Sequence, residues 1–381
     1  MNAQIPTRTL ADALWLLVAR ARGGTHWLAN ADCAVHSLEI DHGAQPVTLL
    51  QTTHASTGAQ TYVASPSSTW VSYPQHEILR RLPSGLGLIG KAVTACMLSP
   101  LAMLVKGGKL DQAAIFGNKL ISTNLYPDWE HSQLQQLHQQ LADTYPQRPL
   151  MLRNICPQVN PSLAASLEQL GWQMVPSRIV YLCDPAQASV GKRNHVKQDK
   201  KLLAGSDMEL LTPQQIQASD LPAMRQVFRS LFIDKHSSLN PDFTPAFFEM
   251  CHESNFLDLY ALRYQEKIVG AVGLYEHYDK YGDRNWLTTP LIGYDQSLPQ
   301  ELGIYRRLMS LLLQQAQQRQ ASLHYSSGAG QFKRARGGVA HMEFTAIYNR
   351  HLPKLARSCN ETFAKLMQNY APAILKKADS L

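Results

Sequence analysis

The densest group of chemically capable side chains lies near the C-terminal end, over residues 326–338. Ser326 and Ser327 end an apolar segment, and a glycine-containing turn then leads into a short segment of helical character. Three cations follow within four residues, namely Lys333, Arg334 and Arg336. The free N–H groups of a helix start, together with Lys and Arg side chains, can hold an oxyanion or a phosphate. The alternative is a solvated basic helix face that ends at the glycines.

A cation held on such a helix can stabilise an oxyanion that forms during a reaction. One well-placed donor there contributes about 3–4 kcal/mol. Lys333 is therefore a candidate catalytic residue. Glu343, at the start of the next predicted strand, is a candidate general base or an ion-pair partner of Arg336. A purely structural ion pair is the alternative for Glu343.

Two further segments carry polar side chains at places where a cleft can form. Asp295 follows the predicted strand over residues 290–294, and strand ends often contribute substrate contacts. Lys235 and Asn240 belong to a predicted loop between two helices, and such loops often line a binding cleft. The alternative for Asn240 is a turn and cap before the helix that follows it.

A basic run at residues 192–201 opens the second half of the chain. Its cations can contact an RNA backbone or a nucleotide phosphate. A solvated helix face is the alternative, and no aromatic residues are interleaved with the cations to stack on bases.

The composition indicates a globular protein with several domains. The chain has 381 residues, of which 45% are hydrophobic, and 36 Lys and Arg outnumber 29 Asp and Glu to give a net charge of +7. An excess of cations is compatible with an anionic partner. No apolar run reaches the roughly 18 residues that span a bilayer, and no signal peptide is recognisable. Six dispersed cysteines and scattered histidines predict reduced thiols and no metal site. We expect a cytoplasmic protein without a membrane partner.

Two halves of the sequence repeat one layout, which predicts a mixed α/β (α+β) fold. In the first half, strands are expected at residues 34–40, 47–53 and 60–64, before helices that alternate with strands up to residue 182. The second half has a similar series, with a long helix near residues 299–319. Asp184-Pro185 and the small residues up to Gly191 form the best linker. We therefore expect an N-terminal unit over residues 1–185 and a C-terminal unit over residues 192–381.

The order of strands and helices resembles a GNAT acyltransferase unit present twice, each unit being a mixed central sheet flanked by helices. Phe332-Lys333 and the glycines after it resemble a C-terminal signature of Fem-type aminoacyltransferases, which are tandem GNAT-fold enzymes. Other short motifs are similar to a FemAB-like branch found beside natural-product biosynthesis genes; they lie at residues 62–66, 122–127, 235–241, 293–295 and 332–343. The resemblance covers roughly residues 30–353. Gly337-Gly338 departs from the family's Phe-Gly pair.

The resemblance implies roles for particular residues. Lys333 would stabilise the charge that develops in aminoacyl transfer, and Phe332 would border the same site. Asn124, Arg153 and Arg178 match the family pattern in the first half. The two arginines would bind an anionic acceptor between the units, although buried ion pairs explain them equally well.

GNAT enzymes that use coenzyme A carry a Q/R-x-x-G-x-G/A loop that holds the pyrophosphate at a helix N-terminus. The equivalent segment here is residues 300–305, in which Tyr305 replaces the last small residue. Its ring would crowd a closely approaching pyrophosphate. We therefore expect an acyltransferase that moves an aminoacyl group from tRNA to a small-molecule or peptide amine, without a resident cofactor. The alternatives are an acyl-CoA or carrier-protein thioester donor, and a non-catalytic GNAT pair that binds an anionic ligand or a protein.

Overall fold

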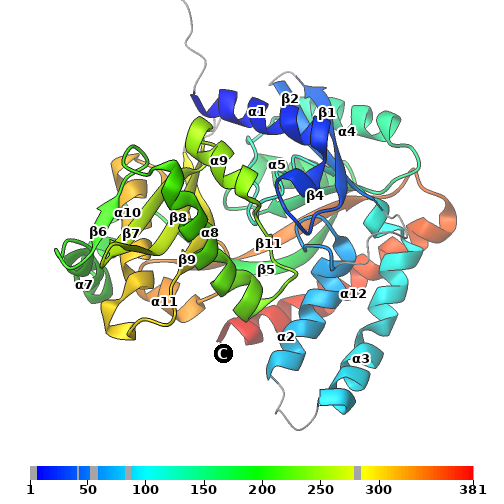
Figure 1. The fold of residues 1–381 in the computed structure, drawn as a ribbon. Coiled ribbons are helices and arrows are strands. Elements are labelled where there is room, and N and C mark those ends of the chain that lie inside the picture. Colours follow the sequence, from blue (N-terminus) through cyan, green and yellow to red (C-terminus); the bar gives the residue numbers. More distant parts are fainter. Residues whose placement is uncertain (1–6, 41–42, 52–58, 82–86, 279–284, 381) are drawn as a thin grey trace, which may run out of the picture.

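One mixed sheet passes through the whole described part of the chain, and helices cover both of its faces (Figure 1). A computed structural model describes residues 7–40, 43–51, 59–81, 87–278 and 285–380. Within these residues the sheet has eleven strands in the order β1-β2-β3-β4-β11-β5-β10-β9-β8-β7-β6. The predicted mixed α/β class is therefore confirmed.

The first half of the chain contains, in order, α1 (Thr7–Arg22), η1 (Gly24–His26), β1 (Cys33–Ile40), β2 (Gly43–Leu50), η2 (Ser68–Ser72), α2 (Tyr73–Arg81), α3 (Gly87–Gly107), η4 (Leu110–Gln112), β3 (Ala114–Phe116), α4 (His131–Thr144), β4 (Leu150–Ile155), α5 (Pro161–Gln169) and β5 (Gln173–Cys183). The second half contains α6 (Ala188–Gly191), α7 (Asn194–Leu203), β6 (Glu209–Leu211), η5 (Ala218–Asp220), α8 (Leu221–Arg229), η6 (Ser230–His236), α9 (Pro245–Ser254), β7 (Asp258–Tyr264), β8 (Lys267–His277), β9 (Trp286–Tyr294), η7 (Gln300–Leu302), α10 (Ile304–Gln318), β10 (Ser322–His324), α11 (Gly330–Ala335), β11 (Val339–Tyr348) and α12 (Lys354–Ser380).

The two halves repeat one strand arrangement, as the sequence predicts. In the first half β1, β2 and β3 are antiparallel neighbours, and β4 runs parallel to β3. In the second half β7, β8 and β9 are antiparallel neighbours, and β10 runs parallel to β9. Parallel neighbours need a crossover connection, which α4 supplies in the first half and α10 in the second.

The last strand of each half, β5 or β11, pairs only with strands of the other half. β11 lies between β4 and β5, and β5 lies between β11 and β10, with antiparallel pairing on both sides of each strand. Each half thus lends one strand to the sheet of the other. The expected boundary between residues 185 and 192 falls just after β5, in a segment that includes α6, and it stays a prediction because the sheet continues across it.

Local sequence signals account for several elements. Leu134, Leu137 and Leu141 form one stripe of α4 and are buried in the core. Pro161 stands in the first turn of α5, where its missing N–H costs nothing. Thr244 caps α9 by accepting a hydrogen bond from the Phe247 N–H at 3.3 Å.

Other predictions of secondary structure are wrong. Residues 60–64, predicted as a strand, form a turn in which the Ala64 N–H donates to the Thr61 carbonyl at 3.1 Å. The Thr61 hydroxyl instead donates to the Leu239 carbonyl in the other half. β3 and the long helix α12, which packs against α3 and β5, are two further elements that the sequence patterns do not predict. None of the described helices combines the length and the apolar character needed to cross a bilayer.

Candidate functional site

A cavity of about 830 Å³ opens at the N-terminal end of α10. Five residues singled out from the sequence line it, namely Lys235, Asp295, Tyr305, Phe332 and Arg336. The other lining residues are His195, Gln198, Tyr294, Gln296, Leu298, Pro299, Gln300, Gly303, Ile304, Arg306, Gln331 and Ala335. We call this cavity the α10 pocket. Its volume lies in the range of small-molecule sites.

Diverging strands and a helix start create the α10 pocket. β9 and β10 pair only over residues 286–288 and 322–324, and β9 then continues to Tyr294 with β8 as its neighbour on the other side. Gly303 precedes α10 with a φ of +60°, and a side chain there would meet Leu202 at 2.5 Å. The first N–H groups of α10 have no carbonyl partner within the helix, and the helix dipole adds positive potential. This end of the pocket therefore suits an anionic group.

Aromatic rings form one wall of the α10 pocket. The Tyr305 ring lies 5.7 Å from Tyr294 and 4.9 Å from Phe332, measured between ring centroids. The Arg336 guanidinium carbon lies 3.3 Å from the centre of the Phe332 ring. Burial raises the pKa of Tyr305 to about 12, so its phenol stays neutral at physiological pH. This wall can stack on a flat ligand such as a nucleobase.

The basic run of residues 192–201 connects to the same pocket through its one acidic residue. Asp199 on α7 is only 2% exposed, and its carboxylate accepts from Arg306 Nε at 2.7 Å and from Arg336 Nε at 2.5 Å. Asp199 thus holds two arginines at the pocket rim. The lysines of the run are exposed; they are Lys192, which follows α6, and Lys197, Lys200 and Lys201 on α7.

Lys333 follows Phe332 on α11, but its side chain does not line the α10 pocket. Its buried Nζ donates to the carbonyls of Tyr325, at 2.7 Å, and Ser327, at 2.6 Å. Burial, with a smaller contribution from the charge of Arg178, lowers the pKa of Lys333 to about 7. An ammonium group has three N–H donors, so one remains for a substrate.

A buried polar network lies where β4, β11, β5 and β10 meet, and we call it the central cluster: Thr123, Asn154, Arg178, His324, Ser326 and Glu343. Arg178 donates to Glu343 from Nε at 2.6 Å and from Nη2 at 3.2 Å. Asn154 Nδ2 donates to the same carboxylate at 2.9 Å. The Thr123 hydroxyl donates to Ser326 Oγ at 3.1 Å and accepts from Arg178 Nη2 at 3.0 Å.

Two irregularities of β11 aim these side chains. The register of β11 shifts against β5 between Glu343 and Phe344, and against β4 between Phe344 and Ala346. Asn154, opposite the second shift, has a φ of +61°, a conformation that asparagine tolerates better than most residues. Bulges re-aim side chains in this way beside many functional sites.

The geometry makes Glu343 a counterion. It is 1% exposed, and its ion-pair partner is Arg178, not Arg336 as the sequence suggested. Burial alone would raise the pKa of Glu343, but the charge and hydrogen bonds of Arg178 hold it below its ordinary value. His324 Nε2 lies 3.6 Å from Glu343, and burial lowers the pKa of His324 to about 4. A carboxylate held in this way is a weak proton acceptor.

The remaining predicted residues are divided among several places. Asn124 joins the central cluster, because its Nδ2 donates to Asn154 Oδ1 at 3.0 Å. Arg153 is also buried nearby, with Asn118 as a hydrogen-bond partner. Arg334 lies apart and donates to the Tyr181 hydroxyl at 3.1 Å. Asn240 is buried in its loop, where its Nδ2 donates to the Phe232 carbonyl at 2.8 Å; the predicted cap is wrong, because Thr244 is the N-cap of α9.

Asp295 and Lys235 have local partners at the pocket rim. The Asp295 carboxylate accepts from the N–H and the hydroxyl of Ser297, at 2.9 and 2.7 Å, and closes the turn after β9. The Lys235 ammonium donates to the Gln296 side chain. Both residues therefore shape the rim of the α10 pocket.

Three members of the central cluster were missed from the sequence: Thr123, Asn154 and His324. Adjacent Arg153 and Asn154 in the otherwise apolar strand LMLRNI were a usable signal, because the whole strand is buried. Polar residues inside such a strand need partners.

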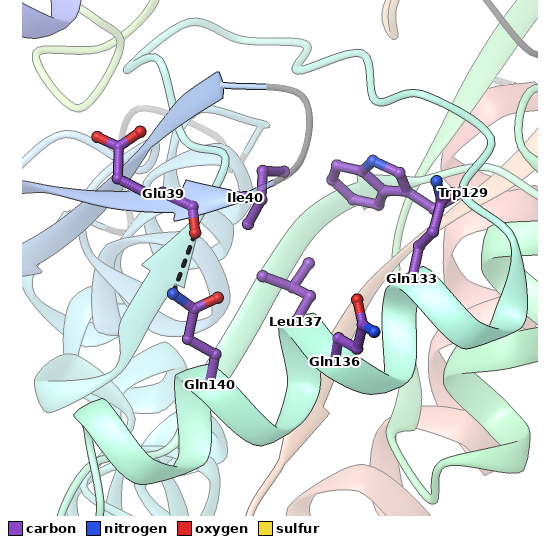
Figure 2. Close-up of a pocket in the computed structure, with 7 residues that line it drawn as sticks. All are labelled: Glu39, Ile40, Trp129, Gln133, Gln136, Leu137 and Gln140. Atoms are coloured by element: carbon purple, nitrogen blue, oxygen red, sulfur yellow. Dashed lines mark hydrogen bonds between the residues drawn. The ribbon is translucent and has the colours of Figure 1, made fainter.

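Another hollow, of about 310 Å³, lies between α4 and the end of β1, as Figure 2 shows. Its floor is Ile40, Trp129 and Leu137, and Gln140 Nε2 donates to the Glu39 carbonyl at 3.0 Å. It contains none of the residues predicted for the site. The α10 pocket is therefore the better candidate for ligand binding.

Comparison with solved structures gives matches at low sequence identity. FemX matches with a TM-score of 0.51 and 7% identity, over 92% of this chain and 98% of that chain. A structure of L-PGS from Bacillus licheniformis matches with a TM-score of 0.49 and 12% identity, over 92% and 95% of the two chains. The C-terminal domain of a putative lysylphosphatidylglycerol synthetase from Agrobacterium fabrum has a TM-score of 0.47 and 12% identity, over 90% and 93%.

No protein-family model and no curated protein matches the sequence. The likeness to FemX extends over nearly the full length of both chains and agrees with the repeated strand arrangement described above. The chain therefore shares the fold of FemX.

Proposed function

We propose that this protein is an acyltransferase that forms an amide bond by transferring an aminoacyl group from aminoacyl-tRNA to an amine acceptor. One observation carries the proposal: neighbouring residues of α11 serve two adjoining sites. Phe332 lines the α10 pocket, whereas Lys333 reaches the loop at Ser327 that borders the central cluster. A donor in the pocket can then present its carbonyl to the free N–H of Lys333.

In this reaction the acceptor amine attacks the ester carbonyl of the donor. A nitrogen–carbon bond forms, and the oxygen of the carbonyl becomes an oxyanion to which the protonated Lys333 donates a hydrogen bond. Collapse of this intermediate breaks the ester carbon–oxygen bond. The amine loses a proton, and the ribose oxygen that leaves gains one. Lys333 with a pKa of about 7 is protonated in a substantial fraction of molecules at neutral pH.

The α10 pocket suits the phosphate-bearing end of such a donor. Arg306 and Arg336 stand at its rim, the α10 N-terminus supplies N–H groups, and the Tyr305 ring offers a stacking surface. The second candidate donor is an acyl-CoA or a carrier-protein thioester, whose pyrophosphate or phosphate would occupy the helix start beside the Tyr305 ring. The acceptor is a small molecule or a peptide, in natural-product or peptide biosynthesis, and transfer takes place in the cytoplasm.

Calorimetric titration separates the donors. We expect charged tRNA to bind with an affinity that falls steeply between two salt concentrations, because several phosphates must be neutralised. Coenzyme A should bind with a Kd above about 1 mM, which is less than about 4 kcal/mol of binding free energy. Uncharged tRNA is the control for the aminoacyl group. Tight, salt-insensitive binding of coenzyme A that Gly303→Ala abolishes would contradict the tRNA donor and favour the thioester.

A non-catalytic GNAT pair that only binds an anionic ligand is distinguished by product formation. Incubation with charged tRNA and a panel of amines, followed by mass spectrometry, should yield an aminoacylated amine. Binding of tRNA without any such product would favour the binding protein.

A further inference from the structure

The side chain of Arg153 carries a buried charge without a counterion. Arg153 lies on β4 and is 8% exposed. Within the described residues its side chain makes one hydrogen bond, from Nη1 to Asn118 Oδ1 at 3.2 Å, and no carboxylate lies within 4.0 Å of it. A guanidinium has five N–H donors, so most of those of Arg153 are unused.

Such a charge is costly, because burial removes water that would otherwise stabilise it. Burial lowers the pKa of Arg153, yet an arginine remains protonated at any physiological pH. A buried cation is therefore normally paired or bound to a ligand. Arg153 is unpaired in the part of the chain that the structure describes.

The neighbouring charges do not neutralise Arg153. Glu343 is the nearby carboxylate, and it is fully engaged by Arg178. His324, with its pKa lowered to about 4, is neutral. The group of Arg153, Arg178 and Glu343 therefore has one positive charge in excess, and protonation of Lys333 increases that excess.

A second unused donor lies near Arg153. The Tyr62 ring lies 6.0 Å from the Arg153 guanidinium carbon, and its hydroxyl makes no hydrogen bond with any described residue. Burial raises the pKa of Tyr62, which keeps the phenol a neutral donor. Tyr62 is held by its N–H bond to the Leu239 carbonyl at 3.0 Å and by edge contact with Tyr73.

We infer that Arg153 and Tyr62 form a binding site for an oxyanion, a carboxylate or a phosphate group of the acceptor. A guanidinium and a phenol hydroxyl are matched to oxygens of this kind. The site lies on the strand from the first half, beside the central cluster, whereas the α10 pocket belongs to the second half. Calling the ligand an acceptor rests on the proposed function; the anion site itself does not.

Thermal unfolding at constant ionic strength tests the site with two probes, inorganic phosphate and acetate, each exchanged for chloride. We expect at least one of them to raise the Tm of the wild-type chain in a saturable way. Stabilisation by phosphate alone identifies a phosphate-bearing ligand, and stabilisation by acetate identifies a carboxylate. No saturable shift with either anion would overturn the inference.

Variants connect the effect to the two residues. Arg153→Gln should weaken the apparent affinity for the anion at least tenfold and leave the Tm without anion unchanged or higher, because it removes an uncompensated charge. Tyr62→Phe keeps the ring and should weaken the affinity severalfold, so it tests the site even if Arg153→Gln fails to fold. Arg357→Gln, at an exposed ion pair on α12, is the matched control and should bind like the wild type. Unchanged affinity in both Tyr62→Phe and Arg153→Gln would refute the site.

Because no transfer reaction is measured, the two proposals fail separately. A chain that binds phosphate or acetate through Arg153 but forms no amide contradicts the proposed function alone. A chain that forms the amide but shows no anion binding contradicts the inference alone.

Discussion

Arg178 and Glu343 form a two-pronged buried ion pair between strands from opposite halves of the chain, with Nε 2.6 Å from Oε1. Arg178 lies on β5 and Glu343 on β11, directly opposite each other in the sheet. The pair thus connects β5 and β11, the two strands that are exchanged between the halves, and holds the central cluster in register. We call this arrangement the strand exchange.

Glu343→Gln should lower the free energy of unfolding by about 3 kcal/mol, because it leaves Arg178, whose side chain is only 18% exposed, without its counterion. Urea unfolding at pH 7 measures the loss. The matched control is Glu361→Gln, whose exposed pair with Arg357 spans 3.8 Å and should contribute below about 0.5 kcal/mol. Glu343→Gln combined with Arg178→Met should recover part of the stability. A loss below about 1 kcal/mol for Glu343→Gln would contradict the counterion role.

Lys333→Ala should lower turnover by about 10²–10³ once a substrate pair is known, because the oxyanion loses its donor. Since only the protonated form donates, wild-type kcat should decline as the pH rises above about 7, the pKa of Lys333. Lys333→Met keeps most of the packing and checks that the fold survives. Lys365→Ala, at an exposed lysine of α12, should retain full activity. Turnover within a few-fold of wild type in Lys333→Ala would remove this lysine from the mechanism.

His324 makes the protein sensitive to acid. Its pKa in the folded chain is about 4, below the ordinary 6.5, so the unfolded chain binds more protons between these values. Stability should therefore fall as the pH drops from about 6.5 to about 4. His324→Asn should flatten that part of the profile, measured by urea unfolding at several pH values. His131→Gln, at an exposed position on α4, should leave the profile as it is. An unchanged slope in His324→Asn would show that other groups cause the acid sensitivity.

Gly293 permits close packing of β9 against α8. A Cβ at this position would lie 2.4 Å from the Phe228 Cα and 2.5 Å from the Phe228 backbone N. Gly293→Ala should therefore cost about 1–3 kcal/mol of stability, because backbone atoms must move apart. Gly191→Ala is the control, since a Cβ there meets nothing within 4 Å. Equal stabilities of the two variants would refute the close approach.

The strand exchange predicts that the two halves depend on each other. Residues 1–185 lack β11, so β4 and β5 have no common neighbour, and residues 192–381 lack β5. Each half alone should be largely unfolded or insoluble, whereas co-expression should give a soluble complex with native-like circular dichroism. Two separately soluble halves with cooperative unfolding would show that the exchange is dispensable.

The sequence predicted what local patterns determine. The leucine stripe of α4, the proline at the start of α5 and the turn before α11 each specify their own element, and the tandem order followed from them. Residues 60–64 were misjudged because alternation of apolar and polar residues looked like a strand, whereas Thr61 and Tyr62 are held by the loop at Leu239.

Pairings between distant residues lay beyond local patterns. Asp295, Tyr305, Phe332 and Arg336 were singled out separately, and the structure places them around one pocket. The partner of Glu343 was misassigned, because Arg336 is near in sequence while Arg178 is 165 residues away. Nothing in the composition of β5 or β11 indicates that each of these strands pairs with strands of the other half of the chain.

The position of β11 also constrains folding during synthesis. β4 ends at Ile155 and β11 begins at Val339, so the ribosome must add 184 residues before β4 gains its second neighbour. At roughly 5–20 residues per second this interval lasts about 10–40 s. Throughout it, the edge of β4 is open to chaperones and to the same edge of another nascent chain. The protein thus completes the sheet of its first half only after β11 has been synthesised.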